Sequence, residues 1–147
     1  MLGIVVSLPR ELRSLTRQRI PVGTWRAIAD NTLVALSGVG RERAYTAGAV
    51  LISQGVTALL SWGCAAALDD SVPPGCLILP ERIIGANGEI HRVNAEWHQR
   101  LYRALGPKHP VRTEPLVESD AIMKTAAEKR TLAAQTNAAA TEIESAE

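Results

Sequence analysis

Phenylalanine is absent from this chain of 147 residues, and aromatic residues make up only 3% of it. The core must therefore be built from aliphatic side chains, mainly Leu, Ile, Val and Ala. The two cysteines, Cys64 and Cys76, belong to no CxxC pair and no Cys/His cluster, so we expect reduced thiols and no structural zinc. No apolar run approaches the ~20 residues that a membrane span needs.

The chain also lacks a large net charge of either sign. The formal net charge is +1, which gives no electrostatic reason to expect nucleic acid as a partner. Hydrophobic residues make up 46% and charged residues 21%, a balance typical of a folded globular domain. The apolar run Met1–Leu8 is short and no basic segment precedes it, so it does not fit a signal peptide. We expect a single cytoplasmic domain over residues 1–147.

Predicted strands and helices alternate along the chain. The run Leu2–Ser7 is typical of a strand buried on both faces, and Pro9 suits the first position of a helix. The other predicted elements are a hairpin of 22–29 and 32–36, a helix over 41–54, strands over 57–62 and 76–84, a helix over 94–105 capped by Asn94, an extended segment over 111–117, a helix over 125–135 and a last element from 138 to 142. This alternation predicts an α/β fold, with three αβα layers around a mixed central sheet.

Acidic side chains stand at two suggestive places. Glu11 lies in the first turn of a helix that follows a buried strand, where a carboxylate can face a ligand or simply complement the helix dipole. Glu142 and Glu144 are two residues apart and share a face if the segment is extended. Paired acids can hold ribose hydroxyls or perform acid–base work, but they can equally begin a solvated helix.

Two turns rich in small residues each come directly after a predicted strand. Gly38–Arg43 suits close approach of a ligand to the backbone and of an anion to a helix N-terminus, or a tight turn with solvated arginines. Arg43 stands where a dinucleotide fingerprint has its third glycine, so that motif is incomplete. Trp62–Leu68 can admit a ligand or pack closely on a helix, and Cys64 there has no matching histidine motif for a catalytic thiol.

Six segments, taken in their order and spacing, resemble the superfamily of nucleoside phosphorylases and methylthioadenosine/adenosylhomocysteine nucleosidases. They are the first strand with Glu11, Ser37–Gly40, Leu60–Leu68, Pro74–Pro80, Glu118–Asp120 and Thr141–Ala146. The step Leu79–Arg82 together with Asp120 is similar to a bacterial subgroup associated with hopanoid synthesis, which acts on adenosylhopane.

The resemblance implies cleavage of the N-glycosidic bond of a purine nucleoside by phosphate or water, through a ribosyl cation that carboxylates can stabilise. It implies a small-molecule nucleoside as partner, a homo-oligomer, and no cofactor apart from phosphate as a possible co-substrate. It also assigns roles to residues. Glu11 would orient the attacking water, and Gly40, Gly63 and Cys64 would flank the water or phosphate site. Glu144 would hold the ribose hydroxyls, Ile143 would pack under the sugar, and Ile122 and Met123 would lie near the base. From the residues alone, Arg41 and Arg43 can add charge for a phosphate at the Gly40 turn, and Glu142 is a substrate-binding candidate beside Glu144.

The sequence also departs from that pattern. Ala66–Ala67 replaces a Gly-Gly pair, Ser61 replaces a phosphate-binding arginine of the purine phosphorylases, and Ile122 replaces an aromatic residue near the base. The segment that carries the family's general acid lies beyond residue 147, so we expect a fold truncated at its C-terminus. The alternative function is a non-catalytic remnant or oligomer subunit that binds nucleosides weakly. Glu11, Gly40, Gly63 and Glu144 each follow a predicted strand, and we expect them to gather around one pocket.

Overall fold

The computed structural model describes residues 1–121 and 123–143 and has the mixed α/β fold that the sequence predicts. The chain divides into two compact units, one of residues Met1–Cys64 and one that begins at Ala65, and each is described by itself. The helices are α1 (Pro9–Leu12), α2 (Arg41–Ser53), α3 (Ala95–Leu105) and α4 (Ala126–Thr136). None of the described helices is long and apolar enough to cross a membrane.

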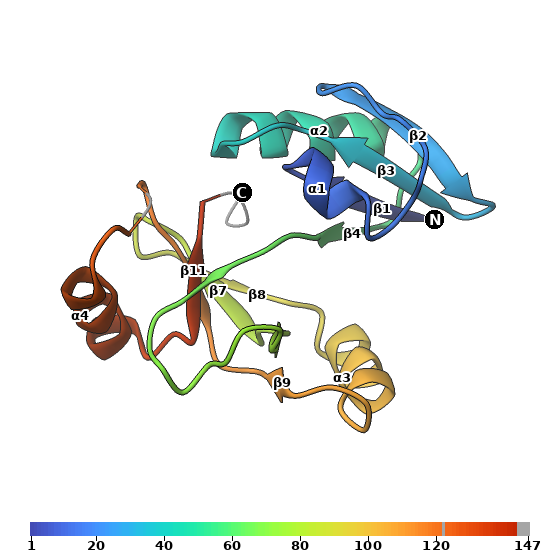
Figure 1. The fold of residues 1–147 in the computed structure, drawn as a ribbon. Helices are drawn as coiled ribbons and strands as arrows, with labels where there is room; N and C mark the ends of the chain where they lie inside the picture. The colour runs from blue at the N-terminus through green and yellow to red at the C-terminus, as the bar shows by residue number, and fades with distance from the viewer. Residues whose placement is uncertain (122, 144–147) are drawn as a thin grey trace. The chain divides into compact units, whose positions relative to one another are not determined.

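The first unit is built on a four-stranded sheet with the order β2-β3-β1-β4 (Figure 1). Its strands are β1 (Leu2–Val6), β2 (Thr24–Ala29), β3 (Thr32–Leu36) and β4 (Ala58–Ser61). β1 pairs in parallel with both β3 and β4, which confirms that the first strand lies inside the sheet. β2 and β3 form the predicted antiparallel hairpin, so the sheet is mixed.

Helices cover both faces of this sheet. Successive residues of a strand point to opposite faces, and the core divides accordingly. Ile4 and Val34 are in register and pack with Leu12 of α1 on one face. Leu33 packs with Leu51 of α2 on the other face. This unit therefore has three layers, helix on sheet on helix, with an aliphatic core on each side.

β4 is less covered than the sequence suggests. It pairs with β1 alone in this sheet, and the side chain of Leu59 is 40% exposed. The strand is present, but the prediction that 57–62 is buried is wrong, because each of these residues is exposed or half-buried. An edge strand has one neighbour fewer to cover it, and an apolar run alone does not tell an edge strand from a central one.

The second unit holds a five-stranded mixed sheet with the order β5-β11-β10-β7-β8. Its strands are β5 (Ala66–Ala67), β7 (Arg82–Ile84), β8 (Ile90–Arg92), β10 (Leu116–Glu118) and β11 (Ala140–Glu142). β10 runs parallel to β7 and β11, while β5 and β8 pair antiparallel at the two edges. Leu132 of α4 packs against a small buried cluster of Leu68, Val117 and Ala138.

A separate two-stranded parallel sheet joins β6 (Leu77–Ile78) to β9 (Val111–Arg112). The prediction of one continuous strand over 76–84 is wrong, because the segment divides into β6 and β7 around Pro80. Proline has no N–H to donate to a sheet and is found at strand ends. The segment over 111–117 divides in the same way near Pro115.

The ends of the helices agree with the sequence signals. Asn94 caps α3, its Oδ1 accepting from the Trp97 N–H at 2.9 Å. Thr125 caps α4 by accepting from the Glu128 N–H at 3.2 Å, and the Glu128 carboxylate accepts in return from the Thr125 N–H at 2.9 Å. Such reciprocal capping satisfies amide groups that the first helical turn leaves without partners.

Candidate active site

The carboxyl ends of three strands of the first unit meet at one edge of its sheet, because β3 and β4 both run parallel to β1. Glu11 lies in α1, which follows β1, and Gly40 and Gly63 lie in the turns after β3 and β4. In open α/β sheets this edge is where ligands bind. Parallel pairing therefore places at one edge three positions that are far apart in the sequence.

The Glu11 carboxylate is held from two sides at this edge. Its Oε2 accepts from the Leu8 N–H at 3.0 Å, at the start of the same helix. Its Oε1 accepts from the Cys64 N–H at 2.9 Å, on the turn after β4. The residue is only 9% exposed. Two backbone donors thus fix a nearly buried carboxylate between the ends of β1 and β4.

Gly63 makes room for this carboxylate. A Cβ atom placed on Gly63 would lie 3.1 Å from Glu11 Oε1 and 3.2 Å from its carboxyl carbon. These distances are shorter than nine in ten Cβ contacts in proteins, so a residue with a side chain would push the carboxylate by a few tenths of an ångström. The close approach explains why the turn after β4 carries glycine before Cys64.

A second contact fastens α1 to the turn after β4. The Trp62 Nε1–H donates to Ser14 Oγ at 2.9 Å, and Ser14 Oγ in turn donates to the Glu11 carbonyl at 2.6 Å. The sequence analysis did not single out Ser14, and a serine two residues past a four-residue helix carries no recognisable signal. Its hydroxyl nevertheless ties the backbone of Glu11 to the indole of Trp62.

The turn after β3 leads into α2 through Gly40, which is the N-cap residue and has a φ of 111°. This backbone conformation is rarely adopted by residues with a side chain. Arg41 and Arg43 lie in the first turn of α2. The Arg43 side chain folds back over Gly38, where a Cβ atom would lie 2.9 Å from Arg43 Nη1. Arg43 therefore lies against the turn rather than extending away from it.

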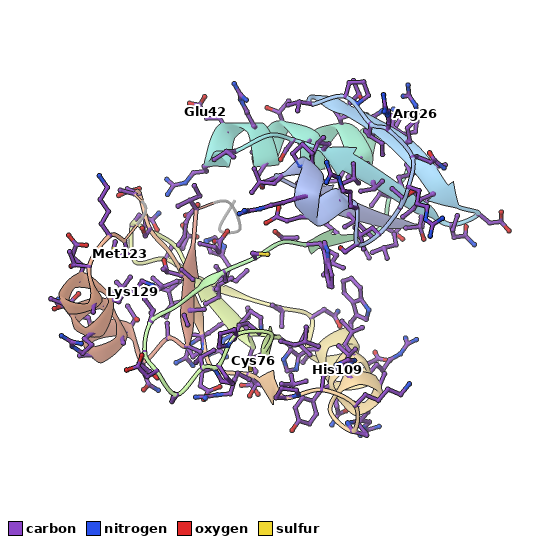
Figure 2. All side chains as sticks on the ribbon, viewed as in Figure 1. Arg26, Glu42, Cys76, His109, Met123 and Lys129 are labelled. Atoms are coloured by element: carbon purple, nitrogen blue, oxygen red, sulfur yellow. The ribbon has the colours of Figure 1, made fainter. Side chains whose placement is uncertain are left out.

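The remaining predicted site residues belong to the second unit. Glu142 is the last residue of β11 and is in register with Glu118 of β10. The carbonyl of Glu142 accepts from the Ser119 N–H at 2.9 Å. Ile143 follows β11 and is half-buried, and Met123 is half-buried on the segment that leads into α4 (Figure 2). Ile122 and Glu144 lie outside the described residues.

Glu118 is an acid that the sequence analysis quoted only as part of a motif. It is 3% exposed, and its strand pairing places it beside Glu142. Residues paired in this way have neighbouring side chains on one face of a sheet. The motif Glu118–Asp120 was enough to draw attention to Glu118 in the sequence. Only the register of β10 with β11 shows that Glu118 and Glu142 are neighbours.

Carboxyl groups with a lowered pKa lie elsewhere, in the second unit. Hydrogen bonds from Ser71 lower the pKa of Asp69, and the side chain of Arg112 lowers the pKa of Glu114. Backbone N–H donors at the start of α4 lower the pKa of Glu128. Each of these groups has a structural partner that accounts for the shift, so none of them marks a site by itself.

The possible metal-ligating side chains and the two cysteines lie apart from one another in the described residues. Within residues 1–121 and 123–143, no three His, Cys, Asp or Glu side chains gather as a metal site would require. Both cysteines are free: Cys64 is exposed, and Cys76 donates to the Pro110 carbonyl at 3.4 Å.

The family model of the phosphorylase superfamily matches residues 2–146. The chain belongs to the phosphorylase superfamily. A comparison with curated proteins gives no match by sequence.

Solved structures show where this fold recurs. The chain is similar to the 5′-methylthioadenosine-bound D198N mutant of the nucleosidase MTAN from Helicobacter pylori, with a TM-score of 0.85, 17% identity, and coverage of 99% of this chain and 75% of that one. Futalosine hydrolase of Helicobacter pylori gives a TM-score of 0.83 and 17% identity over 99% of this chain and 75% of its own. The 5′-methylthioadenosine/S-adenosylhomocysteine nucleosidase of Neisseria meningitidis gives 0.84 and 15% over 99% and 76%. At these identities the likeness establishes the fold.

Membership of the phosphorylase superfamily agrees with the resemblance drawn from the six sequence segments. The structure brings Glu11, Gly63 and Cys64 into contact and places Gly40 at the same edge of the first sheet. Arg43 lines a cavity on the α2 face of that sheet. The roles of these residues toward a substrate remain predictions.

Proposed function

We propose that this member of the phosphorylase superfamily hydrolyses the N-glycosidic bond of a purine nucleoside, with Glu11 orienting the attacking water. The observation that carries the proposal is the position of the Glu11 carboxylate, fixed by the N–H groups of Leu8 and Cys64. Each carboxylate oxygen uses one lone pair for a backbone donor and keeps another for a hydrogen of the nucleophile. A fixed acceptor of this kind positions a water without reorganising during the reaction.

The reaction follows from that position. As the bond from C1′ to the purine nitrogen breaks, its electron pair leaves with the purine, which takes up a proton from solvent, and the proton that Glu11 receives from the attacking water returns to solvent afterwards. The water oxygen forms the new bond to C1′ and passes a proton to Glu11. Positive charge develops on the ribosyl group in the transition state, and a nearby fixed carboxylate stabilises it.

Water is favoured over phosphate as the nucleophile for two reasons. A phosphate dianion at Glu11 would be repelled by the carboxylate. Ser61 stands where the resemblance places a phosphate-binding arginine in purine phosphorylases. Glu144, outside the described residues, keeps its implied role of holding the ribose hydroxyls, and Glu142, Ile143, Ile122 and Met123 keep theirs toward sugar and base.

The test is release of adenine by the purified chain, measured by chromatography with and without phosphate. Methylthioadenosine, adenosine and adenosylhopane are the substrates, the last because of the resemblance to the hopanoid-associated subgroup. We expect release without phosphate, and a fall in kcat of about 100-fold or more in Glu11→Gln, the usual contribution of a general base. Glu42→Gln, an exposed acid on α2, is the matched control and should keep full activity (Figure 2).

Two results would change the proposal. Release that requires phosphate, with ribose 1-phosphate as product, would make phosphate the nucleophile. Saturable nucleoside binding with no turnover, in a chain whose circular dichroism is that of a folded protein, would support a binding module in place of an enzyme.

A further inference from the structure

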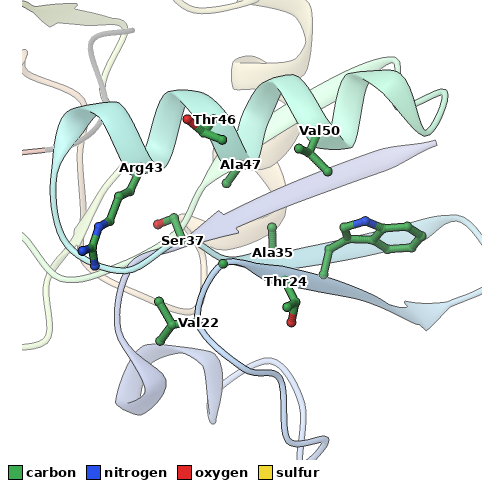
Figure 3. A pocket seen from close by; sticks show the side chains of 10 residues that line it. Val22, Thr24, Ala35, Ser37, Arg43, Thr46, Ala47 and Val50 are labelled. Atoms are coloured by element: carbon green, nitrogen blue, oxygen red, sulfur yellow. The ribbon is translucent and has the colours of Figure 1, made fainter.

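A cavity of about 340 Å³ lies between α2 and the β2–β3 hairpin of the first unit (Figure 3). α2 packs on β1 and β3, and the hairpin continues past it to the edge strand β2. Ala35 on β3 and Ala47 on α2 both line the hollow, and two such short side chains cannot fill the gap between helix and sheet. None of the residues that carry the proposed hydrolysis lines this cavity.

The walls of the cavity are largely apolar. Besides the two alanines, Val22, Trp25 and Val50 line it, and Val22 and Val50 are 53% and 39% exposed at its rim. Exposed aliphatic side chains around an apolar hollow are typical of a ligand site rather than of a solvated surface. The volume lies at the low end of the ~300–1,000 Å³ that small-molecule pockets span, and it is large enough for a single hydrocarbon chain.

One end of the cavity carries a positive charge. Figure 3 shows Arg43 and Ser37 toward one end and Val50 further along α2. Within the described part of the chain, the Arg43 guanidinium has no hydrogen-bond or ion-pair partner. The Ser37 hydroxyl already bonds to backbone carbonyls, and the Thr46 hydroxyl donates to the Glu42 carbonyl at 2.8 Å. Arg43 is the charged side chain of the lining, and its guanidinium donors are available to a ligand.

We propose that this cavity binds a single-chain carboxylate, with the hydrocarbon between Ala35 and Ala47 and the carboxylate on Arg43. A guanidinium presents two parallel N–H donors that match the two oxygens of a carboxylate. Burial of the hydrocarbon against Trp25 and the valines supplies the attraction, and the ion pair selects the head group and its orientation. The site is separate from the proposed hydrolysis and does not depend on it.

Isothermal titration calorimetry with decanoate, below its micelle concentration, tests the proposal, and decan-1-ol serves as the uncharged comparison. We expect saturable 1:1 binding of decanoate that weakens as salt is raised. Arg43→Gln should weaken decanoate binding about fivefold, the value of an exposed ion pair, and leave decan-1-ol binding unchanged. Arg19→Gln, an exposed arginine outside the cavity, is the matched control and should change neither.

Substitutions that fill the cavity distinguish binding inside it from unspecific binding to the protein surface. Ala47→Leu should abolish binding of both probes, and Val50→Glu should weaken decanoate binding more than decan-1-ol binding even if Ala47→Leu fails to fold. Equal binding of decanoate to the parent chain and Arg43→Gln would overturn the proposal, as would unsaturable binding. Analytical ultracentrifugation tests whether the chain dimerises through this cavity. A dimer that dissociates in Val50→Glu would show that a second copy covers the cavity, and this result would also overturn the proposal.

Discussion

The two units bury their apolar side chains in different ways. In the first unit, strands of four to six residues carry separate aliphatic clusters on both faces of one sheet. In the second unit, strands of two or three residues carry one small cluster beneath α4. The carboxylate of Glu11 is fixed within the unit that has the longer strands and the fuller core, and preorganised sites need such rigid support.

Truncating one fully buried leucine in each unit should expose this difference. Leu51 is 0% exposed and packs with Leu33, Ala35 and Val56, whereas Leu68 is 1% exposed and packs in the smaller cluster. Large-to-small substitutions cost most where the surroundings cannot collapse, so we expect Leu51→Ala to lower the free energy of unfolding by about 4 kcal/mol and Leu68→Ala by about 2 kcal/mol. Urea denaturation measures both, and equal losses would refute the comparison.

Crowding the carboxylate should damage the candidate site more than the fold. In Gly63→Ala the new methyl group pushes Glu11 and loosens its bond to the Cys64 N–H, so we expect a loss of about 1 kcal/mol in stability. Small displacements of a catalytic group are costly, and adenine release should fall about tenfold or more.

Gly48→Ala is the matched control for Gly63→Ala. Its Cβ would lie 3.6 Å from Leu59, an ordinary contact, within a helix that alanine favours over glycine. Unchanged activity in this control, together with reduced activity in Gly63→Ala, would assign the effect to Glu11. Full activity in Gly63→Ala would show that the position of the carboxylate is unimportant.

The second unit contains a polar atom that its own packing does not satisfy. Thr141 is 5% exposed, and its Oγ1 has no hydrogen-bond partner among the described residues. Thr141→Val replaces the hydroxyl with a methyl group of similar size and should raise the free energy of unfolding by about 1 kcal/mol. In the control Thr131→Val, the lost hydroxyl is an exposed one that donates to the Ala127 carbonyl, and the change should stay within about 0.5 kcal/mol. A loss of stability in Thr141→Val would reveal a partner for the hydroxyl.

The smallest expected effect concerns the acid sensitivity of α4. Backbone N–H donors at Thr125 and Lys124 lower the pKa of Glu128 below its ordinary value of 4.5. Since the folded chain holds the ionised form more strongly, this stabilisation is present above about pH 4.5 and is lost as the pH falls through the lowered pKa. The stability difference between parent and Glu128→Gln should therefore shrink from pH 7 to pH 3 in thermal unfolding measurements. A difference that is constant with pH would contradict the role of the charge.

Local signals predicted most of the secondary structure. The strand over Leu2–Val6, the hairpin across Asp30–Asn31 and the cap Asn94 lie where the sequence placed them. These features depend on neighbours within a few residues, so sequence patterns report them. The prediction for 76–84 was wrong because apolar residues lie on both sides of Pro80, and the sequence analysis gave this apolar pattern more weight than the proline.

The candidate site was predictable in its parts but not in its assembly. Glu11 and Gly63 were singled out from the strands that precede them, but the bond from the Cys64 N–H to Glu11 joins residues 53 apart. The alternative interpretation of Glu11 was that its carboxylate only stabilises the start of its own helix. One carboxylate oxygen does so, because it accepts from the Leu8 N–H. The roles of Ser14 and Glu118 became visible only in the structure. Ser14 accepts from the Trp62 indole, and Glu118 is in register with Glu142.

The sequence by itself determined most of the strands and helices, and that an acid and a glycine each follow a strand. The tertiary structure decided which of these residues lie close together. The parallel pairing of β1 with β3 and β4 brings their carboxyl ends to one edge, and the register of β10 with β11 sets Glu118 beside Glu142. The physical reason is range: side-chain periodicity and capping act over one or two turns, whereas strand order and register depend on burying apolar faces that are distant in the chain.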